Sequence, residues 1–370
     1  MSSEGTSSGE SVRLDSIEDA IAAIARGEAI IAVDDEGREN EGDLIFAAEK
    51  ATTEMTAFMI RHTSRYICVG MTGDDLDRLQ LPPMTAVNED RKGTAYSVSV
   101  DARDVTATGI SAEDRSITIC ALGSARTSPQ DLTRPGHVMP LRAAVGGVLQ
   151  RPGHTEAAVD LAALAGLHPA GALCEMVHDD GRMMDAADCR EFADEHGLLL
   201  ISIADLIRYR LRSEKHVERV VETRLPTEFG DFTAVGFRSL LDGSEHAAII
   251  AGEIGEGDDL LVRVHVECLA GDALRSHSCS CGPRLRESLR RIADEGRGVV
   301  LYLRPITDKG RPIDRHGPSA GAPDPMSYGL GSQILADLGV RSMRLMTASP
   351  DRRYAVDGFG LEISEVIPLA

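Results

Sequence analysis

Residues 29–43 read Ala-Ile-Ile-Ala-Val-Asp-Asp-Glu-Gly-Arg-Glu-Asn-Glu-Gly-Asp. The apolar run 29–33 predicts a buried strand. The loop that follows holds six carboxylates, with Arg38 as the only counter-charge. Carboxylates so close repel one another unless a cation lies among them, and Mg²⁺ prefers such oxygen ligands. Because Arg38 suits a phosphate, the stretch predicts a metal-assisted reaction on a small phosphorylated molecule. A solvated acidic loop is the alternative.

The tetrapeptide Arg-Pro-Gly-His occurs twice, at residues 134–137 and 151–154. Proline fixes the backbone and glycine permits a tight turn, so we expect both copies at turns that present the histidine. A single histidine is more often structural than functional, but the repetition favours a functional role for this pair.

The second copy precedes a predicted helix. Apolar residues recur at helical spacing over residues 157–164, with Thr155 as a plausible N-cap. A helix start preceded by Arg151 and Gly153 is an anion-binding site. His154 is placed where it could reach a metal.

Residues 171–176 read Gly-Ala-Leu-Cys-Glu-Met and predict a short apolar strand that carries one carboxylate. If Glu175 faces the core, it must be paired or protonated. That makes it a candidate general acid or base. An outward-facing Glu175 is the alternative, which strand alternation alone does not exclude.

These motifs resemble 3,4-dihydroxy-2-butanone 4-phosphate synthase over residues 12–210, without a gap. The resemblance is carried by both Arg-Pro-Gly-His copies and by the segments 34–43, 63–68, 108–115 and 173–175. It implies conversion of D-ribulose 5-phosphate to L-3,4-dihydroxy-2-butanone 4-phosphate and formate in riboflavin biosynthesis. It also implies a homodimer built on this domain, with sites near the subunit interface.

The resemblance further assigns roles to individual residues. Glu39 and His154 would ligate Mg²⁺, or Mn²⁺ in its place. The residues expected to act in the chemistry are His137, Glu175, Glu39, Asp43 and Cys68. The residues expected to bind substrate are Arg38, Glu39, Asp43, Thr108, Arg151, Gly153, His154, Thr155 and Glu175. No organic cofactor is expected in this half.

Composition limits the remaining possibilities. The 370 residues favour two domains, and the net charge of −20 argues against nucleic acid and anionic membranes as partners. No apolar run approaches the length of a membrane span. Seven cysteines without a secretory signal predict a cytoplasmic protein with reduced thiols.

We expect an α+β (mixed α/β) protein of two domains. The predicted division is a disordered tail at 1–11, a synthase domain at 12–212, a linker at 213–222 and a second domain at 223–370. The helices expected are residues 16–27, 54–62, 188–196, 204–222 and 283–294. The further strands expected are residues 67–71, 96–100 and 198–203.

The second half contains three cysteines within fourteen residues, Cys268, Cys279 and Cys281. In a reducing compartment such a group indicates zinc, and three thiolates leave a fourth position for water. Three reduced, buried cysteines are the alternative. Residues 223–370 also resemble GTP cyclohydrolase II, in which the matching cysteines ligate zinc.

This half departs from that family at several positions. The family's helical, substrate-binding insert is replaced by the Gly- and Pro-rich residues 312–325, and Met326 stands where the family has its nucleophilic Arg. Arg284 replaces the Gln that reads guanine. A thioether cannot form the covalent intermediate that Arg could. We therefore expect the domain not to hydrolyse GTP and to act as a structural or regulatory pseudoenzyme.

Two alternatives remain open for the chain. It could be a bifunctional enzyme whose second half still acts on GTP or another nucleotide, with His265, Glu267 and His277 near the metal. It could also be a non-catalytic scaffold or regulatory protein, although no catalytic position of the first half is substituted.

Overall fold

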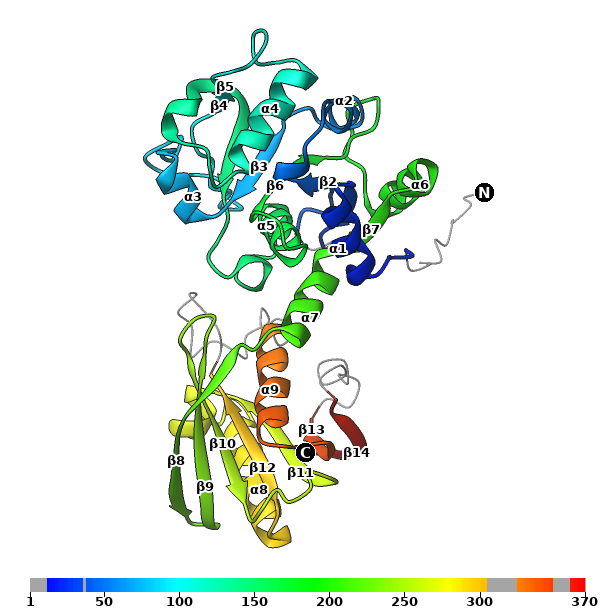
Figure 1. Ribbon diagram of the computed structural model, residues 1–370. Helices are drawn as coiled ribbons and strands as arrows, with labels where there is room; N and C mark the ends of the chain where they lie inside the picture. The colour runs from blue at the N-terminus through cyan, green and yellow to red at the C-terminus, as the bar shows by residue number, and fades with distance from the viewer. Residues whose placement is uncertain (1–11, 36–37, 305–324, 349–359, 370) are drawn as a thin grey trace, which may run out of the picture. The chain divides into compact units, whose positions relative to one another are not determined.

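The computed structural model describes residues 12–35, 38–304, 325–348 and 360–369 (Figure 1). The expected tail at 1–11 and the segment 312–324 lie outside these residues. The chain divides into two compact units, Met1–Tyr209 and Arg210–Ala370. Each unit is built on a seven-stranded sheet that mixes parallel and antiparallel pairs. The predicted mixed α/β class is confirmed.

The first unit has the sheet order β4-β5-β3-β6-β2-β1-β7. Its strands are β1 (Ile30–Val33), β2 (Gly42–Ala47), β3 (Cys68–Met71), β4 (Val100–Ala102), β5 (Leu132–Arg142), β6 (Ala170–Glu175) and β7 (Leu199–Ser202). Its helices are α1 (Ile17–Arg26), α2 (Thr53–His62), α3 (Gly73–Arg78), α4 (Ala112–Leu122), α5 (His154–Leu164), α6 (Ala186–His196) and the start of α7 (Ile203–Ser213).

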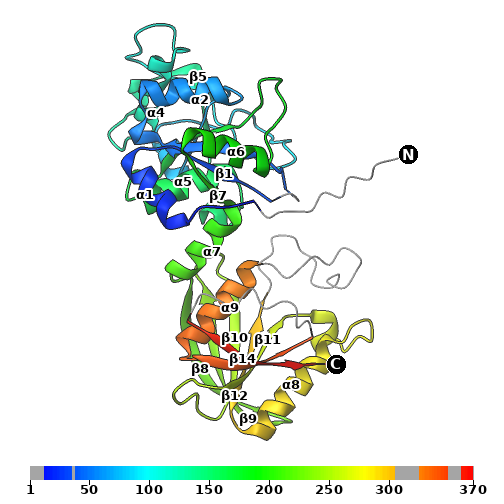
Figure 2. The same cartoon turned by 90° about the vertical axis from the view of Figure 1, so that its right-hand side faces the viewer.

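Alternating strand residues build a core on each face of this sheet. Ile30 and Ile45 pack with apolar residues of α1 and α5 on one face. Ile31 and Leu44 pack with residues of α2, α4 and α6 on the other (Figures 1 and 2). Because both faces are covered, the central strands read as continuous apolar runs.

The neighbouring strands β2, β6 and β3 bring three polar residues together. Asp43 pairs in register with Glu175 between β2 and β6, while Cys68 pairs with Leu173 between β3 and β6. The helix α5 lies against β6, β2 and β3. Its first residue, His154, therefore starts beside the same strand ends.

Two local predictions around β4 and β5 were wrong. The first Arg-Pro-Gly-His copy lies inside β5 and not at a turn, because residues 134–137 are extra residues between the pairs Val100–Val138 and Asp101–Thr133. The expected strand 96–100 shrinks because β4 begins only at Val100, and Tyr96 and Ser97 form isolated bridges.

The expected helix 204–222 ends at Ser213, and the strand β8 (Val217–Thr227) begins four residues later. Residues 217–222, which the sequence placed in a linker, pair with β9 (Gly230–Ser239). Most of β8 is exposed, so no apolar alternation marked it as a strand. Pairing with a neighbouring strand overrides local propensity here.

The second unit has the sheet order β14-β13-β11-β12-β10-β9-β8. Its other elements are β10 (Glu245–Ala251), β11 (Leu260–Val266), the π-turn η4 (Leu269–Ala273), α8 (Cys281–Glu295), β12 (Gly298–Leu303), α9 (Pro325–Asp337), β13 (Ser342–Thr347) and β14 (Glu362–Pro368). Leu330 and Ile334 of α9 join the core on one face of the sheet, and Ile292 of α8 joins the core on the other. Within the described residues, none of the helices is both long and apolar enough to span a membrane.

Candidate active site

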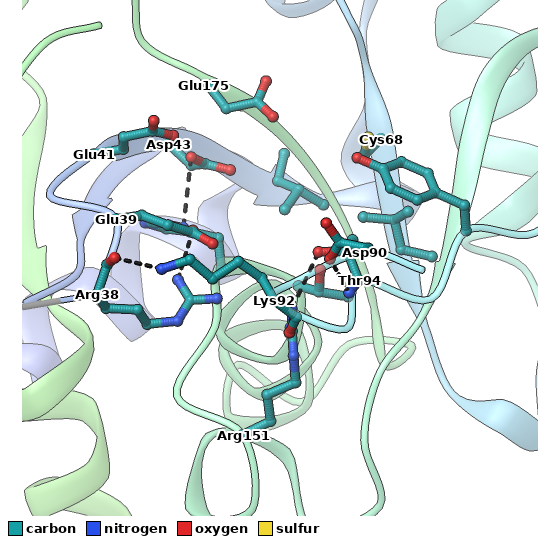
Figure 3. Close-up of a pocket in the computed structure, with 15 residues that line it drawn as sticks. Arg38, Glu39, Glu41, Asp43, Cys68, Asp90, Lys92, Thr94, Arg151 and Glu175 are labelled. Atoms are coloured by element: carbon teal, nitrogen blue, oxygen red, sulfur yellow. Dashed lines mark hydrogen bonds and ion pairs between the residues drawn. The ribbon is translucent and has the colours of Figure 1, made fainter. Parts of the chain in front are cut away.

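The first unit contains a pocket of about 250 Å³ at the ends of β2, β3 and β6 (Figure 3). Carboxylates line one part of its wall, and basic side chains approach from another. The residues that line it are Arg38, Glu39, Glu41, Asp43, Cys68, Asp90, Lys92, Thr94, Tyr96, Leu141, Arg151, His154, Thr155, Leu173 and Glu175.

The acidic loop is organised by Asp34, whose side chain is buried. Its Oδ2 atom lies 2.8 Å from Arg38 and accepts a hydrogen bond from the Glu39 N–H, and its Oδ1 atom accepts one from the Glu41 N–H. The Arg38 guanidinium also lies 2.7 Å from Glu39. Asp34 therefore fixes the loop so that Glu39 and Glu41 border the pocket.

A buried imidazole lies among these carboxylates. His154 Nδ1 lies 3.9 Å from Glu39 Oε2 and 3.7 Å from Asp43 Oδ1. Asp43 is 3% exposed and His154 is 6% exposed. Within the described residues, neither Asp43 Oδ1 nor His154 Nε2 has a hydrogen-bond partner. Buried polar atoms normally have one.

This donor set fits a divalent cation. Asp34, Glu39 and His154 each offer a ligand atom, and these atoms lie within 4.8 Å of one another. Burial raises the pKa of Asp43 well above its usual range, and Glu175 and Glu41 raise it further. Burial lowers the pKa of His154, which favours the neutral imidazole that a metal requires. A cation here would relieve the repulsion and occupy the unpartnered atoms.

The basic groups of the pocket gather around the start of α5, next to His154. The predicted N-cap, Thr155, is wrong, because the helix begins at His154; Gly153 is the N-cap, and no side chain caps this helix start. Arg151 lies 2.7 Å from the buried Glu156. A Cβ atom on Gly153 would lie 2.5 Å from Arg151 Nη1 and 3.1 Å from Arg38 Nη2, so only glycine lets both guanidinium groups approach. The helix start and these arginines can bind an anion.

Glu175 faces the pocket at the end of β6 (Figure 3). Ser64 Oγ donates a 2.7 Å hydrogen bond to its Oε2 atom, which orients the carboxylate. Burial raises the pKa of the nearby Cys68 thiol well above its ordinary value. Burial thus favours the neutral form of the Cys68 thiol at this wall of the pocket.

Two expected site residues, Thr108 and His137, are not among the residues that line this pocket. His137 Nδ1 lies 2.8 Å from Asp101 Oδ2, and the His137 N–H donates to Asp101 Oδ1. Gly109, beside Thr108, has a φ of 96°, and a Cβ atom there would meet Asp101 and His137. The Asp101–His137 pair, next to Gly109, thus forms a second polar group in the same unit.

Asp101 and the pocket segment that contains Asp90, Lys92, Thr94 and Tyr96 were not among the predicted site residues. Asp101 follows an alternating stretch and resembles an ordinary strand carboxylate. The pocket segment carries no regular secondary structure, so periodicity gave no signal. No motif of the sequence marked Lys92 as a pocket residue.

The second unit brings its three cysteines together. The sulfur atoms of Cys268, Cys279 and Cys281 lie within 4.8 Å of one another, and those of Cys268 and Cys279 are 3.8 Å apart. A Cβ atom on Gly271 would lie 2.7 Å from Cys279 Sγ, so glycine admits the cluster. Thiols this close fit zinc.

The polar residues that the alternative prediction placed near this metal are arranged differently. His265 bonds to Asp272 at 2.9 Å, and Asp272 accepts the Cys268 N–H. Glu267 lies 3.8 Å from Arg304, and His277 is exposed. Among His265, Glu267 and His277, the structure connects His265 to the cysteine cluster by hydrogen bonds, through Asp272.

The fold and the pocket define a metal-assisted enzyme for a small anionic substrate, because a donor set that suits a divalent cation adjoins basic groups that suit an anion. The chain belongs to the 3,4-dihydroxy-2-butanone 4-phosphate synthase family. The sequence model of that family matches residues 18–209, and the model of GTP cyclohydrolase II matches residues 218–368.

The curated relatives and solved structures agree with this membership. The riboflavin biosynthesis protein RibBA of Nocardia farcinica is 56% identical and that of Mycobacterium tuberculosis is 55% identical; the alignments cover 96% of this chain and 91% and 89% of those proteins. RibBX of A. baumannii, described as a two-domain 3,4-dihydroxy-2-butanone 4-phosphate synthase, has a TM-score of 0.79 and 36% identity over 96% of this chain and all of that one. A 3,4-dihydroxy-2-butanone 4-phosphate synthase in complex with two magnesium ions has a TM-score of 0.53 and 44% identity, over 54% of this chain and 98% of that one.

Proposed function

We propose that the first unit converts D-ribulose 5-phosphate to L-3,4-dihydroxy-2-butanone 4-phosphate and formate, with Mg²⁺ or Mn²⁺. The observation that carries the proposal is the buried contact between Asp43 and His154, beside Glu39. Asp43 Oδ1 and His154 Nε2 have no hydrogen-bond partner among the described residues, and both side chains line a pocket that also contains basic groups. The family match to residues 18–209 supports the choice of substrate.

The reaction requires proton removal next to a carbonyl, loss of water, a skeletal rearrangement and release of formate. Glu39 and His154 would hold the metal, which when bound supplies Lewis-acid stabilisation of developing negative charge. Glu175, oriented by Ser64, and Asp43 are placed to transfer protons. Arg38, Arg151 and Thr155 would bind the substrate among the basic groups of the pocket.

A site that lacks Thr108 and His137 is incomplete, so we propose a homodimer in which a second copy supplies them. The pocket and the Asp101–His137 pair are separate polar groups within one unit. Mixing Glu39→Gln and His137→Ala chains under exchange conditions should restore part of the formate release that each lacks alone. Failure of two folded, exchanging variants to complement would contradict a shared site.

The test of the activity is Mg²⁺-dependent formate release from ribulose 5-phosphate by the full chain. Glu39→Gln removes a charged ligand atom, and we expect it to lower that release by about 100-fold or more. Glu54→Gln, at an exposed position in α2, is a matched control. Full formate release by Glu39→Gln would remove the metal-ligand assignment.

For the second unit there are two proposals, an active GTP cyclohydrolase and a catalytically inactive domain. The family match to residues 218–368 and the name RibBA of the relatives favour the bifunctional alternative, in which this unit hydrolyses GTP. Met326 in place of the expected nucleophile, together with the description of RibBX as a synthase, favours an inactive unit. Incubation of the chain with GTP, followed by detection of formate and pyrophosphate, separates them. Release at ordinary enzymatic rates would exclude the pseudoenzyme.

A further inference from the structure

The three basic side chains of the pocket differ in how their charges are balanced. Arg38 pairs with Asp34 and Glu39, and Arg151 pairs with the buried Glu156. Lys92, in contrast, pairs with no carboxylate among the residues that the structure describes. Its charge is therefore the one that no side-chain carboxylate of the described residues balances, and it adds to the anion-binding groups that the two arginines supply.

The segment around Lys92 is held at the pocket from both sides. The backbone carbonyl of Lys92 accepts a 3.3 Å hydrogen bond from Arg151 Nη2, and Thr94 Oγ1 accepts one at 3.2 Å. The Lys92 ammonium donates to the backbone carbonyl of Arg38. In Figure 3 the side chain extends between Glu39 and Arg151. An ammonium group has three donors, so this contact leaves donors for a ligand.

We propose that Lys92 binds the phosphate group of the substrate and makes the pocket selective for phosphorylated sugars. The inference rests on the proposed function of the first unit. Arg151 connects Lys92 to the uncapped start of α5, where backbone N–H groups also favour an anion. The phosphate would thus lie between Lys92 and the start of α5, next to the residues that would hold the metal.

The test compares full-length Lys92→Met with Lys92→Arg, which keeps the charge. Arg91→Met is the matched control, because Arg91 is exposed, as its neighbour Lys92 is, but does not line the pocket. Formate release is measured against ribulose 5-phosphate at saturating Mg²⁺, with inorganic phosphate as a competing inhibitor. Loss of one charge-assisted hydrogen bond should raise both KM and the inhibition constant of phosphate by about tenfold in Lys92→Met. kcat should change by less than about threefold, and Lys92→Arg and Arg91→Met should stay near the wild-type values.

Two results would overturn the assignment. One is a Lys92→Met chain with wild-type KM and phosphate inhibition. The other is a fall in kcat and in Mg²⁺ activation with unchanged phosphate inhibition, because Lys92 would then act only by holding the Arg38 backbone. If the wild-type chain releases no formate, the proposed reaction fails. Calorimetric titration of wild-type and Lys92→Met chains with inorganic phosphate then tests the anion site by itself, and equal affinities would refute it.

Discussion

Asp43 is buried beside His154, and its pKa is raised by burial and by the neighbouring Glu175 and Glu41. Because its folded-state pKa exceeds its unfolded value of about 4, Asp43 contributes stability only at low pH. That contribution is lost as the pH rises through the folded-state pKa. Without metal at neutral pH, this carboxyl group therefore destabilises the first unit.

We expect Asp43→Asn to raise the melting temperature of the metal-free protein while abolishing formate release, as for other strained functional residues. The gain should be larger at about pH 8 than at about pH 5, because protonation relieves the wild-type penalty at the lower pH. Thermal unfolding of both proteins at the two pH values, with a chelator present, measures it. A difference in melting temperature that is independent of pH would contradict the explanation.

Asp101 holds His137 through two hydrogen bonds, one to the ring Nδ1 atom and one from the backbone N–H. Asp101→Asn removes the charge that selects one ring orientation, so we expect kcat to fall at least about tenfold with little change in KM. Asp104→Asn is the control, since Asp104 is exposed three residues away. Equal kcat values for the two variants would mean that Asp101 has no part in positioning His137.

At this scale, the distinctive motifs of the sequence predicted Glu39, His154 and Glu175 as site residues, and all three line the pocket. It could not identify Asp101, because its partner lies 36 residues away and is reached only through the pairing of β4 with β5. The sequence also could not show that Thr108 and His137 are not among the residues that line the pocket, because a motif gives no distances between side chains.

At the scale of elements, the irregular pairing of β5 with β4 places His137. Gly136 lies where a Cβ atom would overlap the backbone of Val100 and Asp101. We expect Gly136→Ala to destabilise the first unit by about 2 kcal/mol or more and to reduce formate release. Gly73→Ala is a suitable control, because its Cβ would meet only the flexible end of Arg142. Similar melting temperatures for the two variants would contradict a close approach at Gly136.

The predicted elements with strong periodicity were confirmed, including α1, α6 and α8. The elements that failed were β4 and β8. In both, the strand is defined by its partner and not by its own sequence, because β4 is short and β8 is largely exposed. Local patterns identify elements that bury one face of their own and miss elements that depend on distant pairing.

For the whole molecule, the pocket residues all fall between Arg38 and Glu175. We therefore expect a chain that ends after α7, at Ser213, to release formate with kcat within about threefold of the full chain. A chain that ends at Arg219 is a poorer comparison, because it cuts β8 inside its pairing with β9. Steady-state assays of the purified proteins test this, and a folded but inactive short chain would show that the first unit needs the second.

The cysteine cluster gives the second unit its own prediction. Cys279→Ser should reduce bound zinc and lower the melting temperature of this unit, while formate release stays unchanged. Metal analysis and two-probe thermal unfolding measure both effects. Ser278→Ala, at an exposed neighbouring position, is the control. A zinc content equal to that of the control would argue for three reduced thiols without a metal.

The confinement of the pocket to residues 38–175 also has an evolutionary consequence. Selection for the sugar-phosphate reaction acts directly on fewer than half of the codons of this gene. The codons of the second unit can drift, provided that this unit still folds and does not aggregate. In a lineage where a separate gene supplies GTP cyclohydrolase activity, the second unit could therefore lose that activity by neutral substitution. Riboflavin synthesis would continue.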